Sequence, residues 1–191
     1  MVPMPSIKLS RDDQDTCLYV ARQSIKHGLI DGQSLQINMK DYSADLQQQA
    51  ASFVTLHKHG SLRGCIGALE PHQPLINDIA AHAYAAAFQD PRFPPLEEYE
   101  YDDLDLDISV IGQAEEIHFS SEEDLLEKIQ PNVDGLILEW KSQRATFLPT
   151  VWEQLSDKKD FLNHLKEKAG LSKNWWDDNV KISRYDTFNF E

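Results

Sequence analysis

The chain has 191 residues, of which 32 are Asp or Glu and 18 are Lys or Arg, so its net charge is −14 at pH 7. This negative charge argues against nucleic acid or an anionic membrane surface as the main partner, because both attract cationic surfaces. With 41% hydrophobic residues, the composition is that of an ordinary globular domain. We find neither an apolar run of the roughly 18 residues that span a bilayer nor a signal peptide, and therefore expect a cytoplasmic protein without a membrane partner.

The chain is predicted to begin with a flexible arm, Met1 to Leu9, followed by a helix from Ser10 to about Lys26. Ser10 is a suitable N-cap residue, and Gly28 is predicted to mark the end of the helix. Cys17 falls on the apolar face of the helix, so we interpret it as a small core residue. Only one other cysteine is present, Cys65, and two distant cysteines are typical of free thiols in a reducing cytosol.

A β-hairpin is predicted over Phe53 to Gly67, after a region of weak periodicity from Leu29 to Gln49 that we interpret as a loop. The first arm contains β-branched and apolar residues, and the turn contains Gly60, which can adopt a positive φ. The return arm is unusual because it contains both Gly64 and Gly67. Glycine weakens a strand, so we expect the backbone to pass close to another group at these positions.

Cys65 lies between these glycines and is the sharpest chemical feature of the sequence. Strand alternation places Arg63 and Cys65 on one face of the arm and Gly64 and Ile66 on the other. A cation beside a thiol lowers its pKa and increases the thiolate fraction, so Cys65 and Arg63 are our catalytic candidates. The two glycines are binding candidates, because they would allow a ligand or partner segment to approach the backbone.

A helix is predicted from Leu75 to Gln89, where apolar residues recur at intervals of three and four. His82 lies in its alanine-rich middle and is either a core histidine or a residue of a binding site. The following loop, Asp90 to Pro95, contains three prolines that would hold Asp90 and Arg92 in place. His82, Asp90 and Arg92 are therefore further binding candidates, although the two charged residues would also fit an ordinary surface ion pair.

The remainder of the chain mixes strands and helices. Strands are predicted at Leu104 to Val110, Ala114 to Phe119, Leu136 to Trp140, Arg144 to Leu148 and Val180 to Phe190, and helical segments at Ser120 to Ile129, Thr150 to Leu155 and Asp157 to Ala169. The strand from Leu104 alternates apolar and polar residues, which is typical of an antiparallel sheet with one buried face. The sequence thus predicts an α+β fold with mostly antiparallel sheet flanked by helices. Trp175 and Trp176 fall in a polar loop and are predicted to be exposed.

The motifs of common cofactor sites are missing from the sequence. It contains no glycine-rich phosphate loop and no Cys-x-x-Cys or His-Glu-x-x-His spacing. His57 and His59 straddle one residue near the hairpin turn, which is weak metal spacing. Asp103, Asp105 and Asp107 fit a solvated acidic face better than a set of cation ligands. No metal site is predicted, and the sequence does not identify a cofactor.

The hairpin sequences Phe53-Val-Thr-Leu56 and Leu62-Arg-Gly-Cys-Ile-Gly67 resemble the core signature of the AMMECR domain family, called AmmeMemoRadiSam system protein A in bacteria and archaea. The resemblance continues in the family's order through Asp90-Pro-Arg-Phe93, Ile108-Ser-Val110, Gly135-Leu-Ile-Leu138, Ala145-Thr-Phe-Leu-Pro149 with Val151-Trp152, and Phe161-Leu162 to Lys168-Ala-Gly-Leu171. It covers roughly Ser10 to Tyr185. The stretch from Leu29 to Gln49 matches poorly, so a family contact there is not implied.

The resemblance implies a single domain over residues 10–191, made of a larger and a smaller lobe that are closely packed. It implies a cleft between the lobes, with the segment from Arg63 to Gly67 at or near it. It also implies two partners, a Memo-type protein related to non-haem iron dioxygenases and a radical SAM protein. It implies no particular reaction or substrate.

Two functions remain open. In the first, the protein is an enzyme of a multi-protein modification system, with Cys65 as nucleophile or covalent carrier and Arg63 favouring its thiolate. Asp90 and Arg92 would orient a charged substrate, and His57, His59 and His82 are the possible general bases.

In the second function, the protein is a non-catalytic binding or scaffolding module. The hairpin from Arg63 to Gly67 would recognise a ligand or partner, and Cys65 would be a small packing residue. The stiff loop from Asp90 to Pro95, together with Trp175 and Trp176, would complete the recognition surface.

Overall fold

The computed structural model describes residues 9–191, and within them the chain forms two compact units. The first unit comprises residues up to 111 together with 188–191, and the second comprises residues 112–187. Each unit contains a four-stranded antiparallel sheet with helices, which confirms the α+β class. The predicted single domain of two lobes with a cleft between them stays a prediction. Along residues 9–191, no helix has both the length and the apolar character needed to cross a membrane.

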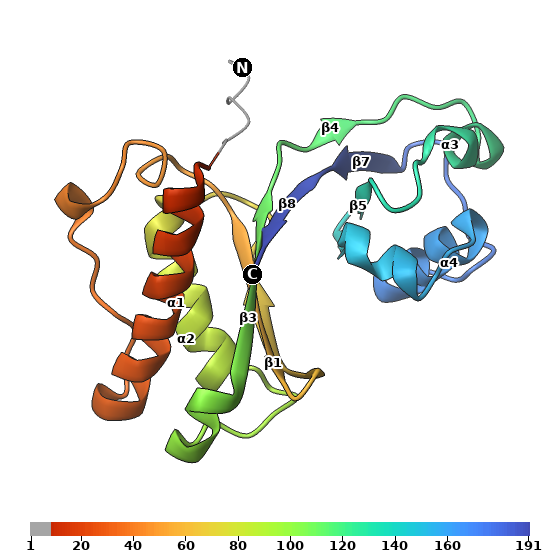
Figure 1. Ribbon diagram of the computed structural model, residues 1–191. Helices are drawn as coiled ribbons and strands as arrows, with labels where there is room; N and C mark the ends of the chain where they lie inside the picture. The colour runs from red at the N-terminus through yellow and green to blue at the C-terminus, as the bar shows by residue number, and fades with distance from the viewer. Residues whose placement is uncertain (1–8) are drawn as a thin grey trace. The chain divides into compact units, whose positions relative to one another are not determined.

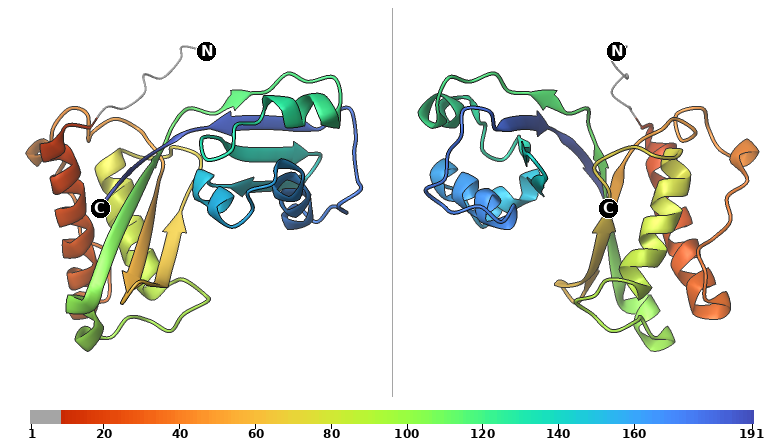
Figure 2. Two further views of the ribbon diagram at one scale, coloured as in Figure 1. Left: turned by 45° about the vertical axis from the view of Figure 1, so that its right-hand side comes forward. Right: turned by 180° about the vertical axis from the view of Figure 1, so that it is seen from behind.

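The first unit contains three strands from the middle of the chain and one from its end. Its elements are α1 (Arg11–Asp31), the 3-10 helix η1 (Met39–Asp41), β1 (Ser52–Lys58), β2 (Ser61–Gly67), α2 (Leu75–Phe88), η2 (Glu98–Asp103), β3 (Leu104–Ile111) and β8 (Thr187–Phe190). The strand order is β2-β1-β3-β8, so β2 and β8 are the edges of the sheet. Helices α1 and α2 lie on one side of this sheet (Figures 1 and 2), with α2 packed against β1 and β2.

Helix α1 begins where predicted but ends later. The Ser10 hydroxyl caps the first turn, and the Asp13 carboxylate accepts a return hydrogen bond from the Ser10 N–H. The predicted stop at Gly28 is wrong, because the helix continues to Asp31 and ends at Gly32, whose φ is +69°. Gly28 instead packs against the aromatic side chains of α2, where a Cβ would overlap the Phe88 ring. The glycine therefore allows the two helices to approach closely.

The hydrophobic core of the first unit lies between its helices and its sheet. Cys17 is fully buried in this core, as predicted. Its burial, and to a smaller extent the nearby negative charge of Asp13, raise the pKa of its thiol to about 12. Leu9 is also buried in this core, so its assignment to the flexible arm was wrong. The rest of the predicted arm, residues 1–8, lies outside the described residues.

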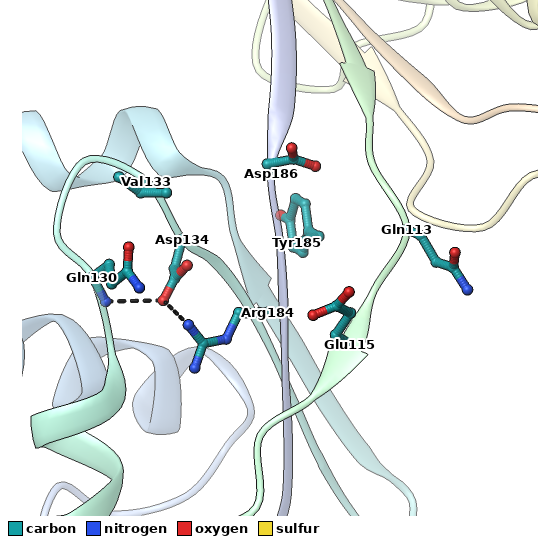
Figure 3. A pocket seen from close by; sticks show the side chains of 8 residues that line it. All are labelled: Gln113, Glu115, Gln130, Val133, Asp134, Arg184, Tyr185 and Asp186. Atoms are coloured by element: carbon teal, nitrogen blue, oxygen red, sulfur yellow. Dashed lines mark hydrogen bonds and ion pairs between the residues drawn. The ribbon is translucent and has the colours of Figure 1, made fainter. Parts of the chain in front are cut away.

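The second unit is built from residues 112–187. Its elements are β4 (Glu115–Glu116), α3 (Glu122–Lys128), β5 (Gly135–Trp140), β6 (Gln143–Phe147), the 3-10 helix η3 (Pro149–Glu153), α4 (Lys158–Lys168) and β7 (Lys181–Tyr185). The strand order is β4-β7-β5-β6. In its core the rings of Trp152 and Phe161 stack with their centroids 3.7 Å apart. A polar cavity opens beside β4 and β7 (Figure 3).

Two predictions for the end of the chain are wrong. The strand predicted from Val180 to Phe190 is two strands, β7 and β8, which belong to different sheets. Alternation continues through both segments, so it contains no signal that the chain changes sheets between them. The two tryptophans near position 175 are half-buried rather than exposed, since Trp175 packs on Trp140 and Trp176 on Phe119. These rings stabilise the second core.

Candidate functional site

One face of the first sheet carries a group of polar side chains opposite the helices. Thr55 of β1 lies directly between Cys65 of β2 and Asp107 of β3, and His57 follows two residues along the same strand. Residues directly opposite each other in a sheet, or two apart on one strand, share a face. We call Thr55, His57, Cys65 and Asp107 the Cys65 face. All four side chains are partly exposed, in contrast to the fully buried residues that β1 directs toward the helices.

Cys65 is held by hydrogen bonds at both its side chain and its backbone. The Thr55 hydroxyl lies 3.2 Å from Cys65 Sγ and can donate to it. The Cys65 N–H donates to Asp90 Oδ2 at 2.9 Å, and the Cys65 carbonyl accepts from Arg92 Nη2 at 3.3 Å. Since β2 is an edge strand, the two charged residues take the place of a neighbouring strand at this point. The thiol is thus presented on a fixed segment of backbone.

Asp90 and Arg92 form the clamp on this edge. Arg92 binds Asp90 with both Nη2 and Nε, at 2.7 and 3.0 Å, and its backbone N–H also donates to the carboxylate. Hydrogen bonds from the Arg92 side chain, together with those from the two backbone N–H groups, hold the pKa of Asp90 well below its usual range. Asp90 is only 4% exposed, whereas the Arg92 side chain is 54% exposed. The structure therefore brings Cys65, Asp90 and Arg92 together.

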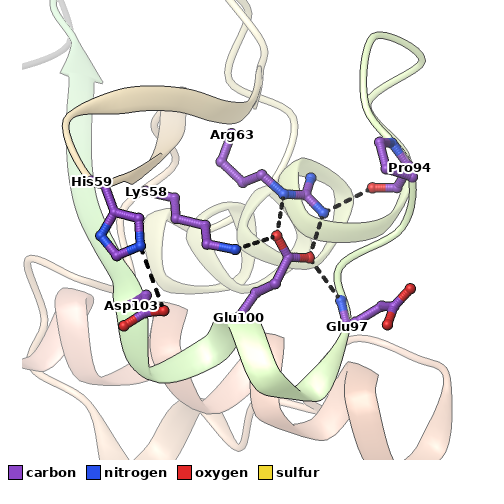
Figure 4. Close-up of polar contacts among 7 residues, drawn as sticks. All are labelled: Lys58, His59, Arg63, Pro94, Glu97, Glu100 and Asp103. Carbon is purple, nitrogen blue, oxygen red and sulfur yellow. Dashed lines mark hydrogen bonds and ion pairs between the residues drawn. The ribbon is translucent and has the colours of Figure 1, made fainter.

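The Arg63 guanidinium binds residues of the segment from Pro94 to Glu100. A β-bulge leaves Arg63 without a partner in β1, and its Nε and Nη2 bind the two oxygens of Glu100 at 3.0 and 2.8 Å. Nη2 also donates to the Pro94 carbonyl at 3.1 Å, and Lys58 Nζ lies 3.0 Å from Glu100 (Figure 4). These contacts fasten the hairpin to the segment from Pro94 to Glu100. The guanidinium that contacts Cys65 is that of Arg92.

The two glycines beside Cys65 face other parts of the chain. A Cβ on Gly64 would overlap the carbonyl oxygen of Ala86 in α2. A Cβ on Gly67 would overlap the ring of Phe53 and the carbonyl oxygen of Ser52. The close backbone approach expected from the sequence is therefore made within the first unit, and a role for the two glycines in ligand binding stays a prediction.

The structure separates the three candidate histidines. His82 lies on α2, with Nδ1 3.0 Å from a buried carboxylate oxygen of Asp78, while His59 lies at the hairpin turn. His57 alone among them belongs to the Cys65 face, where its Nδ1 lies 2.8 Å from Asp107 Oδ2. A carboxylate at this distance fixes the orientation of the imidazole ring.

Sequence reasoning missed Thr55, Asp107 and Glu100 as site residues. The first two carried a usable signal, because alternation in β1 and β3 places them on the same face as His57 once the strand pairing is known. Glu100 carried none, since it lies in an acidic segment without periodicity. In the part of the chain that the structure describes, no three His, Cys, Asp or Glu side chains are placed to hold a metal ion.

Thiol labelling should distinguish the two cysteines. We expect the folded protein to react with one equivalent of a maleimide probe at the partly exposed Cys65, and the unfolded protein with two. Cys17 is fully buried and its thiol pKa is raised to about 12, so it should react only after unfolding. Mass spectrometry of the labelled peptides checks the assignment. Native labelling at Cys17 would contradict it.

The fold and this site define an α+β protein in which a cysteine lies on the face of an antiparallel sheet opposite α1 and α2 and is held by a charged pair at the edge of the sheet. The chain belongs to the AMMECR1 family, whose family model matches residues 18–190.

Relatives of known sequence and structure agree with this assignment. A protein of Methanothermobacter thermautotrophicus is 37% identical over 179 residues, which cover 93% of this chain and 93% of that protein. A protein of Thermotoga maritima is 39% identical over 141 residues, covering 73% and 76%. The crystal structure of the uncharacterized protein PH0010 from Pyrococcus horikoshii is similar with a TM-score of 0.84 at 32% identity, covering 92% of this chain and 89% of that one.

Proposed function

We propose that the chain is the component of a multi-protein modification system that acts together with a Memo-type protein and a radical SAM protein, and that Cys65 is its nucleophile or covalent carrier. The observation that supports this best is the composition of the Cys65 face. A partly exposed thiol, a hydroxyl donor 3.2 Å from its sulfur and a His57–Asp107 pair share one surface.

The arrangement suits proton removal from the thiol. His57 and Cys65 are diagonal neighbours on one face of β1 and β2, with a β-bulge between Leu56 and His57. In the proposed mechanism, water connects the imidazole ring to the sulfur. His57 takes the thiol proton, and Asp107 orients the ring and stabilises its positive charge. The sulfur then uses an electron pair to bond an electrophilic carbon of the substrate. The leaving group departs with the electrons of its bond and takes the proton from His57.

The clamp has a separate part in this proposal. Asp90 and Arg92 act as positioning residues, because they fix the backbone on which the thiol sits. The exposed remainder of the Arg92 guanidinium also offers N–H donors to a negatively charged group of a substrate.

The test is complementation of a host that lacks this protein but retains both partners. We expect Cys65→Ser to abolish the modified product and His57→Gln to lower its rate of formation by about 10²- to 10⁴-fold, the usual contribution of a general base. Cys17→Ala, which removes the buried thiol, serves as the matched control and should keep the output. Full output from Cys65→Ser would refute the nucleophile role.

A binding module is the second candidate, and an exposed surface at the hairpin supports it. The ring of Tyr99 is 72% exposed and lies under Lys58 Nζ, 5.2 Å from the ring centroid, and Leu62 is also exposed. Aromatic side chains of this kind are common anchors of protein interfaces. If the protein is a binding module, Tyr99→Ala should weaken co-purification with the Memo-type protein. Cys65→Ser should then leave both co-purification and formation of the modified product unchanged.

A further inference from the structure

A cavity in the second unit, independent of the Cys65 face, has the features of a ligand site. It has a volume of about 290 Å³ and lies between β4, β7 and the loop before β5 (Figure 3). Small-molecule sites typically begin at about 300 Å³, so this cavity suits a small ligand rather than a segment of another protein. Its lining residues include three with carboxylates, one arginine and two glutamines.

The charged residues of this cavity are only partly paired with one another. Glu115 and Arg184 lie directly opposite in the β4–β7 pair, on the same face and with opposite charge. Arg184 nevertheless turns toward the buried Asp134, with Nη1 3.5 Å from Oδ2, and Asp134 also accepts the Gln130 N–H at 2.9 Å. The Glu115 side chain has no hydrogen-bond or ion-pair partner among residues 9–191, and neither does the carboxylate of Asp186.

Arg184 supplies the complementary group. Its side chain is only 26% exposed, and within the described residues none of its N–H groups donates a hydrogen bond. A guanidinium carries five such donors in a planar fork that matches a carboxylate. The cavity therefore offers donors for an anion from Arg184 and acceptors for a cation from Glu115 and Asp186.

We propose that this cavity binds a free α-amino acid through both of its charged groups. The ligand carboxylate is held by Arg184, and its α-ammonium group by Glu115 and Asp186. Three carboxylates against one guanidinium leave a net charge of −2 in the lining (1 − 3 = −2), which favours an amino acid with a second cationic group, such as lysine.

The first experiment titrates the full chain with three small probes and follows backbone amide shifts by NMR. L-Lysine carries both groups, cadaverine lacks the carboxylate, and 6-aminohexanoate lacks the α-ammonium group. We expect shifts at Glu115, Arg184 and Asp186 with lysine, and binding weaker by about tenfold or more for each of the other two probes, equivalent to ~1.4 kcal/mol.

A matched pair of variants locates the site. Glu115→Gln should weaken lysine binding by about tenfold, whereas Glu116→Gln, with the same change of charge on the opposite face of β4, should not. Both positions are exposed, and the spectra themselves report folding. Absence of shifts at the three residues up to the solubility limit of lysine would overturn the proposal. Cadaverine binding as tightly as lysine would do so as well, since the cavity would then recognise only a cation. Neither result bears on Cys65.

Discussion

Replacing Glu100 by glutamine should destabilise the first unit by about 3–5 kcal/mol, the usual cost of removing one partner from a buried ion pair. Arg63 is only 8% exposed, and Glu100 supplies both of its closest acceptors, at 2.8 and 3.0 Å. Without the carboxylate, a buried guanidinium would lack a counter-charge. This loss of stability should appear as a lower urea concentration at the midpoint of unfolding, while the dependence of the free energy on urea concentration stays unchanged. Glu98→Gln, an exposed change of equal charge in the same 3-10 helix, should alter stability by less than about 0.5 kcal/mol.

The same pair predicts a pH dependence. Hydrogen bonds from Arg63, with further ones from the Glu97 N–H and Lys58, lower the pKa of Glu100 from its ordinary value of 4.5 to about 2. A lowered pKa means that the folded state binds fewer protons than the unfolded state in this range. The ionised Glu100 carboxylate therefore contributes about 3 kcal/mol to the free energy of unfolding. This contribution is fully present above pH 4.5 and is lost as the pH falls toward 2. Wild type and Glu100→Gln should converge in stability over this window. A constant difference between them would contradict this account.

Replacing Gly64 by alanine should cost about 3 kcal/mol, at the upper end for overpacking, and should loosen the backbone that carries the thiol. The new Cβ would overlap the Ala86 carbonyl oxygen. The position of the Cβ is fixed by its own backbone and the carbonyl belongs to the main chain, so no side-chain rotation can relieve the overlap. Helix α2 therefore has to move away from β2.

Thermal unfolding measures this loss, and Gly60→Ala is its control. Gly60 lies in the turn of the same hairpin with open space around it and a φ of +76°, so alanine there should cost only about 1 kcal/mol for the backbone conformation. If Gly64→Ala and Gly60→Ala lost equal amounts of stability, α2 would be able to move away from β2 at little cost in free energy, and the packing argument would be wrong.

Several parts of this site were predictable from single strands. The alternation of β3, the turn at Gly60 and the presence of Cys65 on a glycine-flanked strand all follow from local sequence. The partner of Arg63 was not predictable in this way, because Arg63 and Glu100 are 37 residues apart. Strand alternation alone pairs the Arg63 guanidinium with the Cys65 thiol, because these two residues lie two positions apart on one strand.

The sequence by itself determined the α+β class, most of the helix and strand positions and the family, because these depend on local periodicity and on short motifs in a fixed order. Only the tertiary structure decided which groups meet. It joined Arg63 to Glu100 and placed His57 rather than His82 on the face of Cys65. It also divided the last predicted strand between two sheets. Such pairings are set by strand register and by loops that close over long separations, and a one-dimensional pattern encodes neither.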